Sequence, residues 1–190
     1  MQQNDKKYWE TFYLSNTKLE CSEFCNFIID YFKNKNVKNI LDCGCGNGRD
    51  SFALSQISNV DAVDNCGFLP TSKNNVHFFT DDFVTVDKNK YELVYSRFTF
   101  HSITNEQHVS FLDTINVNSY LVIETRSKKG ENDDVFHGKG HYRNYTDIDY
   151  LKNILSLKKF EIIFIKEDVN FAKYKNENPI CIRVICKKTA

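Results

Sequence analysis

The sequence predicts a single α/β domain with a doubly wound, mostly parallel sheet. Three observations lead to this fold class. The chain has 190 residues, which is the length of one domain rather than two. It is 41% hydrophobic and 14% aromatic, so it can build a packed core and is not a disordered chain. Apolar runs of strand length alternate with amphipathic stretches of helix length, an order typical of a parallel sheet covered by helices.

The first half of the chain alternates between helix and strand patterns. Residues 19–35 place large apolar side chains such as Phe24, Ile28 and Phe32 at helical spacing, which predicts an amphipathic helix. The apolar run at 39–44 ends in glycine and predicts a buried strand. One further helix and three further strands are expected up to residue 96, at 51–57, 60–64, 76–79 and 91–96.

Beyond residue 100, Val109, Leu112 and Ile115 share one helical face, which predicts another helix. The elements expected in this half are a helix, a strand, a second helix and two final strands, at 104–115, 119–125, 148–157, 160–165 and 180–186. The last two strands follow one another without room for a full helix, so we expect an antiparallel C-terminal edge strand. The complete sheet should contain about seven strands.

Charge and hydropathy exclude some classes of protein. The 25 Lys and Arg residues equal the 25 Asp and Glu residues, which argues against nucleic-acid binding because that needs a basic surplus. No apolar run has the length of a membrane span, and the first residues lack the apolar segment of a signal peptide. We therefore expect a cytoplasmic protein without a membrane span. The sequence does not indicate an oligomeric state.

The cysteines do not predict a metal site. Seven are present, an odd number, and none of them forms a CxxC pair. Free thiols in a reducing compartment are therefore expected, and no metal.

The most informative segment is the turn after the first buried strand, Ile40-Leu41-Asp42-Cys43-Gly44-Cys45-Gly46-Asn47-Gly48-Arg49-Asp50. Glycines let a backbone adopt positive φ and approach a ligand closely. The amides that open the following helix add partial positive charge. A phosphate loop would need GxxxxGK followed by Ser or Thr, and a dinucleotide site would need GxGxxG. This turn has GxGxG, with no lysine after Gly48.

This turn resembles motif I of the class I S-adenosylmethionine-dependent methyltransferases, whose fold is Rossmann-like. Asp64 ends the second strand twenty positions after Gly44, where an acid can bind two ribose hydroxyls. Asp81, Asp82 and Phe83 follow the third strand, where the family carries an acid for the adenine amino group and a neighbouring apolar contact. The resemblance covers nearly the whole chain and implies S-adenosyl-L-methionine as the cofactor.

The resemblance implies a set of cofactor-binding residues from the N-terminus to the end of the fourth strand. They are Tyr8, Trp9, Tyr13, Asp42, Gly44, Gly46, Gly48, Arg49, Asp64, Asn65, Asp81, Asp82, Phe83 and Ser96. The three N-terminal aromatics are expected to form a lid that excludes water, and the alternative is ordinary packing on the sheet. The glycines could likewise form a tight turn without a ligand, and Asp64 could cap a turn. Agreement of these residues in order and spacing favours the methyltransferase.

The residues after the fourth strand, 95–103, commonly face the transferred methyl group in this family. The amino-methylating DNA enzymes carry an Asn/Asp-Pro-Pro-Tyr/Phe loop there, and the cytosine C5 enzymes carry Pro-Cys. The only prolines in this chain are Pro70 and Pro179, so these two kinds of nucleobase methylation are not expected.

A narrower resemblance concerns small bacterial methyltransferases of capsule and O-antigen biosynthesis. It rests on Ser96-Arg97-Phe98 with His101, on Ile123-Glu124-Thr125-Arg126-Ser127, on His141-Tyr142-Arg143 and on Tyr8-Trp9-Glu10 with Tyr13. This resemblance implies an oxygen acceptor on a sugar hydroxyl or a phosphoryl group of a surface-glycan precursor.

The expected acceptor site lies beyond the carboxyl ends of the fourth and fifth strands. The expected substrate-binding residues are Arg97, Arg126, His141 and Arg143, because guanidinium groups match a phosphoryl group and ligands bind at this edge of a parallel sheet. The alternative is that these charges pair with acids such as Glu124 and Asp147. Arg97 and His101 are the expected catalytic residues, with His101 as the base for a hydroxyl; the alternative is that His101 only packs or caps a helix.

Within the one domain, residues 1–36 are expected to form the lid and first helix, 37–126 the cofactor-binding half, and 127–190 the acceptor-side loop and final strands. Two other functions stay open. One is a non-catalytic subunit that binds S-adenosylmethionine. The other is a methyltransferase for an unrelated small molecule or RNA, although the balanced charge disfavours RNA.

Overall fold

The computed structural model describes residues 3–15, 20–129, 136–137, 141–173 and 177–190. The strands of its main sheet are β1 (Asn39–Cys43), β2 (Asn59–Asp64), β3 (Val76–Thr80), β4 (Leu93–Arg97), β5 (Tyr120–Arg126), β8 (Phe160–Asp168) and β9 (Cys181–Lys188). Two short strands, β6 (Phe136–His137) and β7 (His141–Tyr142), pair separately. The helices are α1 (Gln3–Ser15), α2 (Glu23–Phe32), α3 (Arg49–Leu54), α4 (Asn105–Asp113) and α5 (Ile148–Leu157), with a 3₁₀ turn η1 (Phe100–Ser102).

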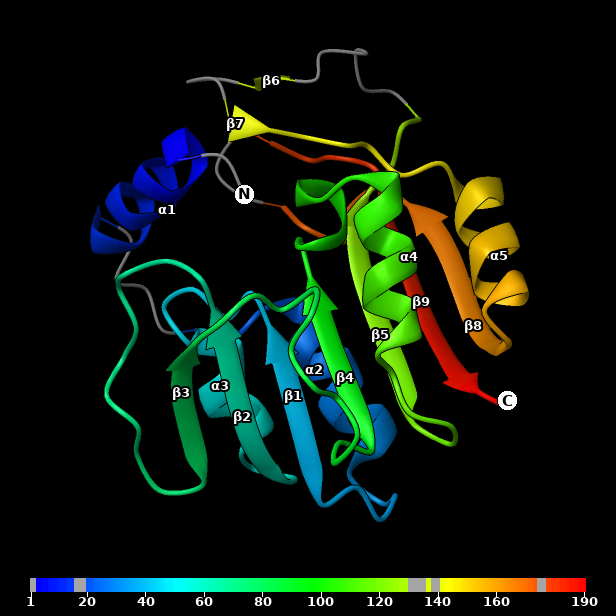
Figure 1. Ribbon diagram of the computed structural model, residues 1–190, viewed down its shortest axis with the longest axis horizontal. Coiled ribbons are helices and arrows are strands. Elements are labelled where there is room, and N and C mark those ends of the chain that lie inside the picture. Colours follow the sequence, from blue (N-terminus) through cyan, green and yellow to red (C-terminus); the bar gives the residue numbers. More distant parts are fainter. Residues whose placement is uncertain (1–2, 16–19, 130–135, 138–140, 174–176) are drawn as a thin grey trace.

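The main sheet has seven strands in the order β3-β2-β1-β4-β5-β9-β8 (Figure 1). Strands β1 to β5 run parallel, and β9 is antiparallel to both of its neighbours. The predicted doubly wound, mostly parallel fold is therefore confirmed. The antiparallel C-terminal strand is also present, but it does not lie at the edge: β9 pairs with β5 along Tyr120–Arg126, and β8 takes the edge.

The order of strands places a ligand site at one point of the sheet. From β1 the chain proceeds outward to β2 and β3, and then returns to lay β4 on the other side of β1. Ligands of such sheets bind beyond the carboxyl ends of the strands at this reversal. The glycine turn follows β1 and the segment 98–103 follows β4, so both meet there.

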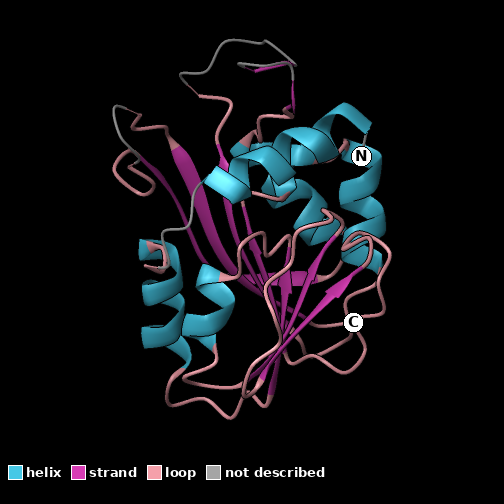
Figure 2. Ribbon diagram, turned by 90° about the vertical axis from the view of Figure 1, so that its left-hand side faces the viewer, coloured by secondary structure: helices cyan, strands magenta, loops and turns pink. Residues whose placement is uncertain are grey.

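Helices cover both faces of the sheet, and each face has its own core (Figure 2). On one face, α4 and α5 contribute Phe111, Leu112 and Leu155 to a buried cluster. On the other, α2 and α3 contribute side chains such as Phe24 and Leu54. Neighbouring residues of β1 divide between the two cores because side chains of a strand alternate in direction. Central strands buried on both faces explain the nearly continuous apolar runs of the sequence.

Most elements lie within a few residues of their predicted ranges, and two differences concern the segments around the site. Helix α3 begins at Arg49, two residues before the expected start, because Gly48 adopts a left-handed conformation (φ +74°) and turns the chain directly into the helix. The stretch after β5 contains two short strands that were not predicted from the sequence, β6 and β7, which pair with each other. In the part of the chain that the structure describes, no helix has the length and hydropathy of a membrane span.

Candidate active site

The glycine turn has the backbone that its sequence predicts. Gly44, Gly46 and Gly48 all have positive φ, at +73°, +53° and +74°. The amides of Gly44 and Cys45 donate to the Val63 carbonyl of β2 at 2.8 and 3.1 Å. A Cβ atom at Gly44 would overlap the Thr99 methyl, so a glycine is needed where this turn meets the segment after β4.

Asp64, at the end of β2, is tied to the glycine turn by its carboxylate. One oxygen accepts a hydrogen bond from the Gly46 amide at 2.9 Å, and the other accepts one from the Cys66 amide at 2.9 Å. Each carboxylate oxygen has a second lone pair, so both can still accept a hydroxyl donor. The side-chain carbonyl of the next residue, Asn65, is buried and has no hydrogen-bond partner among the described residues.

These features fit the cofactor that the sequence resemblance implies. A backbone cradle of left-handed glycines, a buried carboxylate and an unsatisfied amide oxygen are suited to a nucleoside with several hydroxyl and amino donors. Among the described residues, no three His, Cys, Asp or Glu side chains are grouped as a metal site.

Two other acids around this turn are bound by neutral donors. The Ser51 hydroxyl donates to Asp42 at 2.6 Å, and burial raises the pKa of Asp42 to about 7, assisted by the nearby negative charge of Asp50. Asp50 accepts from the amide and hydroxyl of Ser22, both at 2.7 Å, and from the Tyr95 hydroxyl at 2.8 Å. Asp50 thereby joins the start of α2 to α3 and β4.

Helix α1 lies beyond the carboxyl ends of the parallel strands, where a lid was expected (Figure 1). A Cβ atom at Gly46 would overlap the Tyr13 ring, which lies directly on the turn. Burial raises the pKa of the Tyr13 hydroxyl, and the charge of Asp64 raises it further. Trp9 stacks on Tyr13 at 5.9 Å between ring centroids and meets the Tyr8 ring edge-on at 5.1 Å. Sequence reasoning missed Glu10, whose carboxylate accepts from the Gly67 amide at 3.0 Å.

The remaining residues expected at the cofactor separate into two groups. The Asp81 amide donates to the Asp64 carbonyl at 3.3 Å, which places Asp81 beside the site. Asp82 accepts from the Val84 amide and shapes the turn after β3. Phe83, however, is buried in the core, where its ring meets Phe111 edge-on at 6.2 Å. The structure thus gives Phe83 a core position rather than an open contact surface.

Arg49 and Ser96 lie close to the turn but have protein partners. The Arg49 guanidinium is 3.7 Å from Asp50. The Ser96 hydroxyl, which is buried, lies 2.5 Å from the Thr99 hydroxyl.

Arg97 is held by a buried carboxylate. Its Nε donates to Glu124 at 2.9 Å, and the other oxygen of Glu124 accepts from Arg183 at 2.6 Å. Burial raises the pKa of Glu124 while the two arginines oppose that shift. Burial also works against the charge of Arg97, but Glu124 and Asp50 outweigh it and raise the pKa of Arg97. The structure thus places Arg97 in a buried ion pair through its Nε, and its expected role toward the acceptor stays a prediction.

His101 is buried, with its Nδ1 accepting from the Arg126 amide at 3.3 Å. The His101 carbonyl accepts from the Asn144 amide at 2.7 Å. Because Nδ1 accepts this hydrogen bond, the proton of the neutral imidazole ring must be on Nε2. In that tautomer Nε2 carries the proton and is a hydrogen-bond donor. This geometry argues against His101 as a general base through Nε2 and favours a role in holding neighbouring groups in position.

Arg126 and Arg143 form the second pair of charges at this end of the sheet. The Arg126 guanidinium contacts Glu177 at 2.6 Å, and Glu177 is 54% exposed. Burial lowers the pKa of Arg143, and the nearby charge of Arg126 lowers it further. The charge of Arg126 is thus close enough to act on Arg143. The backbone of His141 lies in β7, but its side chain is outside the described part of the chain.

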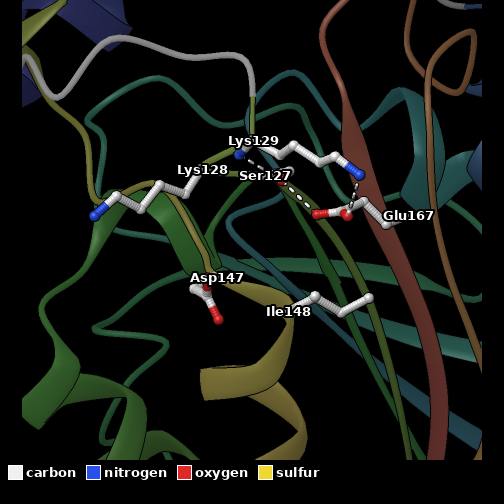
Figure 3. A pocket seen from close by; sticks show the side chains of 6 residues that line it. All are labelled: Ser127, Lys128, Lys129, Asp147, Ile148 and Glu167. Atoms are coloured by element: carbon white, nitrogen blue, oxygen red, sulfur yellow. Dashed lines mark hydrogen bonds and ion pairs between the residues drawn. The ribbon is translucent and has the colours of Figure 1, made fainter.

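A separate polar pocket of about 330 Å³ lies at the ends of β5 and β8 (Figure 3). It is lined by Ser127, Lys128, Lys129, Asp147, Ile148 and Glu167. Ser127 donates to Glu167 at 2.6 Å, and Lys129 lies 3.8 Å from the same carboxylate. Two lysines face two acids, so the lining has no net charge to favour an ion.

Comparisons with known proteins agree with the geometry of the fold. No family model and no curated protein sequence matches the chain. Solved structures do match. A 1,6-didemethyltoxoflavin-N1-methyltransferase from Burkholderia thailandensis, with its acceptor and S-adenosylhomocysteine bound, is 16% identical and has a TM-score of 0.70. The match covers 88% of this chain and 78% of that one.

Two further structures are S-adenosylmethionine-dependent methyltransferases. One, from Methanosarcina mazei, is 13% identical with a TM-score of 0.67, over 85% of this chain and 97% of that one. The other, from Clostridium acetobutylicum, is 13% identical with a TM-score of 0.63, over 87% and 91%. None of these three proteins is described as an enzyme of surface-polysaccharide synthesis, so the capsule and O-antigen resemblance rests on the sequence alone. The chain has the Rossmann-like fold of the class I S-adenosylmethionine-dependent methyltransferases.

Proposed function

We propose that this protein is an S-adenosylmethionine-dependent methyltransferase that binds its cofactor between the glycine turn and α1. The observation that carries the proposal is the Asp64 carboxylate, buried and bonded to the Gly46 amide across three left-handed glycines. Asp64 and Asn65 would bind the nucleoside of the cofactor. The amides of the glycine turn would approach the amino-acid part that is joined to this nucleoside, and Tyr13 would cover the bound cofactor. The cofactor supplies an electrophilic methyl group when bound.

We infer that the acceptor carries a phosphoryl group and that Arg126 and Arg143 bind it. Arg126 pairs with an exposed carboxylate rather than a buried one, so an incoming phosphoryl group can replace Glu177 at little desolvation cost. Guanidinium binds phosphate through two parallel hydrogen bonds. An ionised phosphoryl oxygen needs no base, which agrees with the hydrogen bond that occupies Nδ1 of His101.

The narrower sequence resemblance supports nucleotide sugars or sugar phosphates of surface-glycan synthesis as the acceptor class, with oxygen as the methylated atom. Seven free cysteines support a reaction in the cytoplasm, because free thiols are expected in a reducing compartment. In this mechanism, the arginines orient the acceptor and α1 excludes water from it.

The test has a binding arm and a reaction arm. Calorimetry should show binding of S-adenosylmethionine by the protein and loss of binding in Gly46→Val, because the new side chain collides with Tyr13 at a left-handed position. Mass spectrometry should find methylation of sugar phosphates or nucleotide sugars but not of the same sugars without phosphate. Arg126→Ala should lose this reaction, whereas the control Lys129→Ala, an exposed lysine of the separate pocket, should keep it.

Three outcomes would contradict parts of the proposal. Equal methylation of the neutral sugar would assign a hydroxyl acceptor. Cofactor binding without methylation of any acceptor would support the non-catalytic subunit. Absence of cofactor binding would overturn the whole proposal.

A further inference from the structure

Phe98, the first residue after β4, has a backbone conformation that bulky residues avoid. Its φ is +60°. Five described non-glycine residues have positive φ, and three of the others are asparagines, which tolerate this region: Asn74, Asn118 and Asn170. Lys159 follows the C-cap of α5, where left-handed residues are common. Only Phe98 of these five has no local explanation, and strained residues of this kind cluster at functional sites.

The strain is maintained by the neighbouring strand and by buried charges. The Phe98 amide donates to the Glu124 carbonyl at 2.8 Å, which extends the pairing of β4 with β5 by one residue. The side chain of the same Glu124 binds Arg97, the residue before Phe98, and is itself bound by Arg183 of β9. Glu124 therefore holds Phe98 through its backbone carbonyl and the preceding residue, Arg97, through its side chain.

The left-handed conformation brings the Phe98 ring into contact with two guanidinium groups. The Arg97 Cζ lies 4.3 Å from the ring centroid, and the Arg126 Cζ lies 6.0 Å from it. The His101 ring is 5.3 Å away. Arg97 is paired with a buried acid, whereas Arg126 is paired with an exposed one. The ring thus lies between an arginine whose partner is a buried acid and an arginine whose partner is an exposed acid.

We propose that Phe98 is a positioning residue that holds Arg126 in place to bind the phosphoryl group of the acceptor. This inference rests on the proposed function, because it assumes that Arg126 binds an anion. An aromatic face attracts a guanidinium group through its quadrupole and limits the orientations of the long arginine side chain. The strained backbone is retained because a relaxed residue would direct the ring away from Arg126.

The first test asks whether the strain is real. Phe98→Gly and Phe98→Ala both remove the ring, but only glycine accepts φ +60° without strain. At an ordinary position alanine is the more stable of the two. Here Phe98→Gly should melt about 4 °C above Phe98→Ala. A higher Tm for Phe98→Ala would overturn the claim that the position is strained.

The second test measures anion binding with inorganic phosphate as the probe. The signal followed is the ¹⁵N–¹H resonance of the Arg126 Nε group during a phosphate titration. Phe98→Gly and Phe98→Leu should bind phosphate about fivefold more weakly, which is the loss expected for one cation–π contact. Phe98→Tyr keeps the aromatic face and should stay within about twofold of the unmodified protein.

Controls separate this inference from the proposed function. Lys159→Gly relieves a left-handed residue far along the chain and should leave phosphate binding unchanged. Arg126→Ala has no Arg126 resonance, so phosphate binding to this variant is followed on the Nε resonance of Arg143 and should be lost. If Arg126→Ala binds phosphate as well as the unmodified protein, the proposed anion site fails. If Arg126→Ala loses binding while Phe98→Gly and Phe98→Leu keep it, the positioning role of Phe98 is overturned and the anion site stands.

Discussion

The two halves of the site hold their carboxylates in different ways. In the half formed by β1 and β2, carboxylates accept hydrogen bonds from backbone amides and hydroxyls. In the half formed by β4, β5 and β9, a carboxylate pairs with arginines. Asp64 is held by the amides of Gly46 and Cys66. Glu124 is held by Arg97 and Arg183. The first arrangement involves residues within about twenty positions of one another. The second joins strands that are far apart in the chain.

This difference shows how each half is suited to its ligand. Backbone donors cannot change their direction as side chains do. The glycine turn therefore presents a fixed shape to a cofactor that stays the same whatever the acceptor. Arginine side chains have several rotamers, and their direction depends on what they contact. The acceptor half can therefore change its ligand by small changes in sequence, provided that the buried pair which anchors it is kept.

The largest effect is expected when the Glu124 carboxylate, which pairs with Arg97 and Arg183, is removed. Glu124→Ala leaves two buried arginines without their carboxylate and should lower the free energy of unfolding by about 3–5 kcal/mol. Urea denaturation measures this. The matched control is Glu177→Ala, which removes the exposed partner of Arg126 and should cost less than about 1 kcal/mol. Equal losses in both variants would show that Glu124 is no more important than a surface pair.

A smaller effect is expected when Asp64, whose carboxylate binds the glycine turn, is removed. Asp64→Ala removes two charged hydrogen-bond acceptors and the proposed ribose ligand, and should weaken cofactor binding about 100-fold. Asp61→Ala is the control, because Asp61 lies on the same strand and binds Lys90 and Tyr91 instead. Calorimetry with S-adenosylhomocysteine distinguishes them. Similar affinities for the two variants would contradict the assignment of Asp64.

The pH dependence of Asp42 sharpens the comparison further. Burial raises its pKa to about 7, so the folded state binds a proton that the unfolded state has released. The stability that Asp42 contributes is complete below about pH 4 and is lost as the pH rises through about 7. Asp42→Asn cannot ionise, and its advantage over the unmodified protein should grow by about 2–3 kcal/mol between pH 5 and pH 8.

The control for this pH effect is Asp61→Asn. Burial works against the charge of Asp61, but Lys90 and Tyr91 outweigh it and lower the pKa of Asp61. That carboxylate is ionised throughout the same pH range. The His77 ring lies 3.4 Å from it, so both proteins of the control carry His77→Gln, and the Asp61→Asn difference should then stay constant. A constant difference for Asp42→Asn as well would disprove the raised pKa.

The smallest expected effect lies at the exposed edge of the acceptor half. Glu177→Gln removes the carboxylate that competes with an anion for Arg126, so phosphate should bind about two- to threefold more tightly. The same NMR titration of Arg126 Nε measures it. Weaker phosphate binding in this variant would mean that Glu177 supports the anion site instead of competing with it.

The two halves also differ in how far the sequence predicts them. The glycine turn and Asp64 could be found because their spacing is local and glycine is required where φ is positive. Phe83 was expected at the cofactor, but its ring is buried in the apolar core on the α4 side of the sheet. The pairing of Glu124 with Arg183 could not be predicted, because it depends on β9 lying between β5 and β8 rather than at the edge.

The internal position of β9 has a consequence for the order in which the chain can fold during synthesis. Domains form as their residues leave the ribosome, and long-range strand pairings form late. Strands β1 to β5 and the glycine turn are made first, but β5 has only β4 as a neighbour until residues 181–188 emerge. Until then Glu124 has only one of its two arginines. The nascent chain can thus build the cofactor half early, and its acceptor half is completed only when β9 inserts.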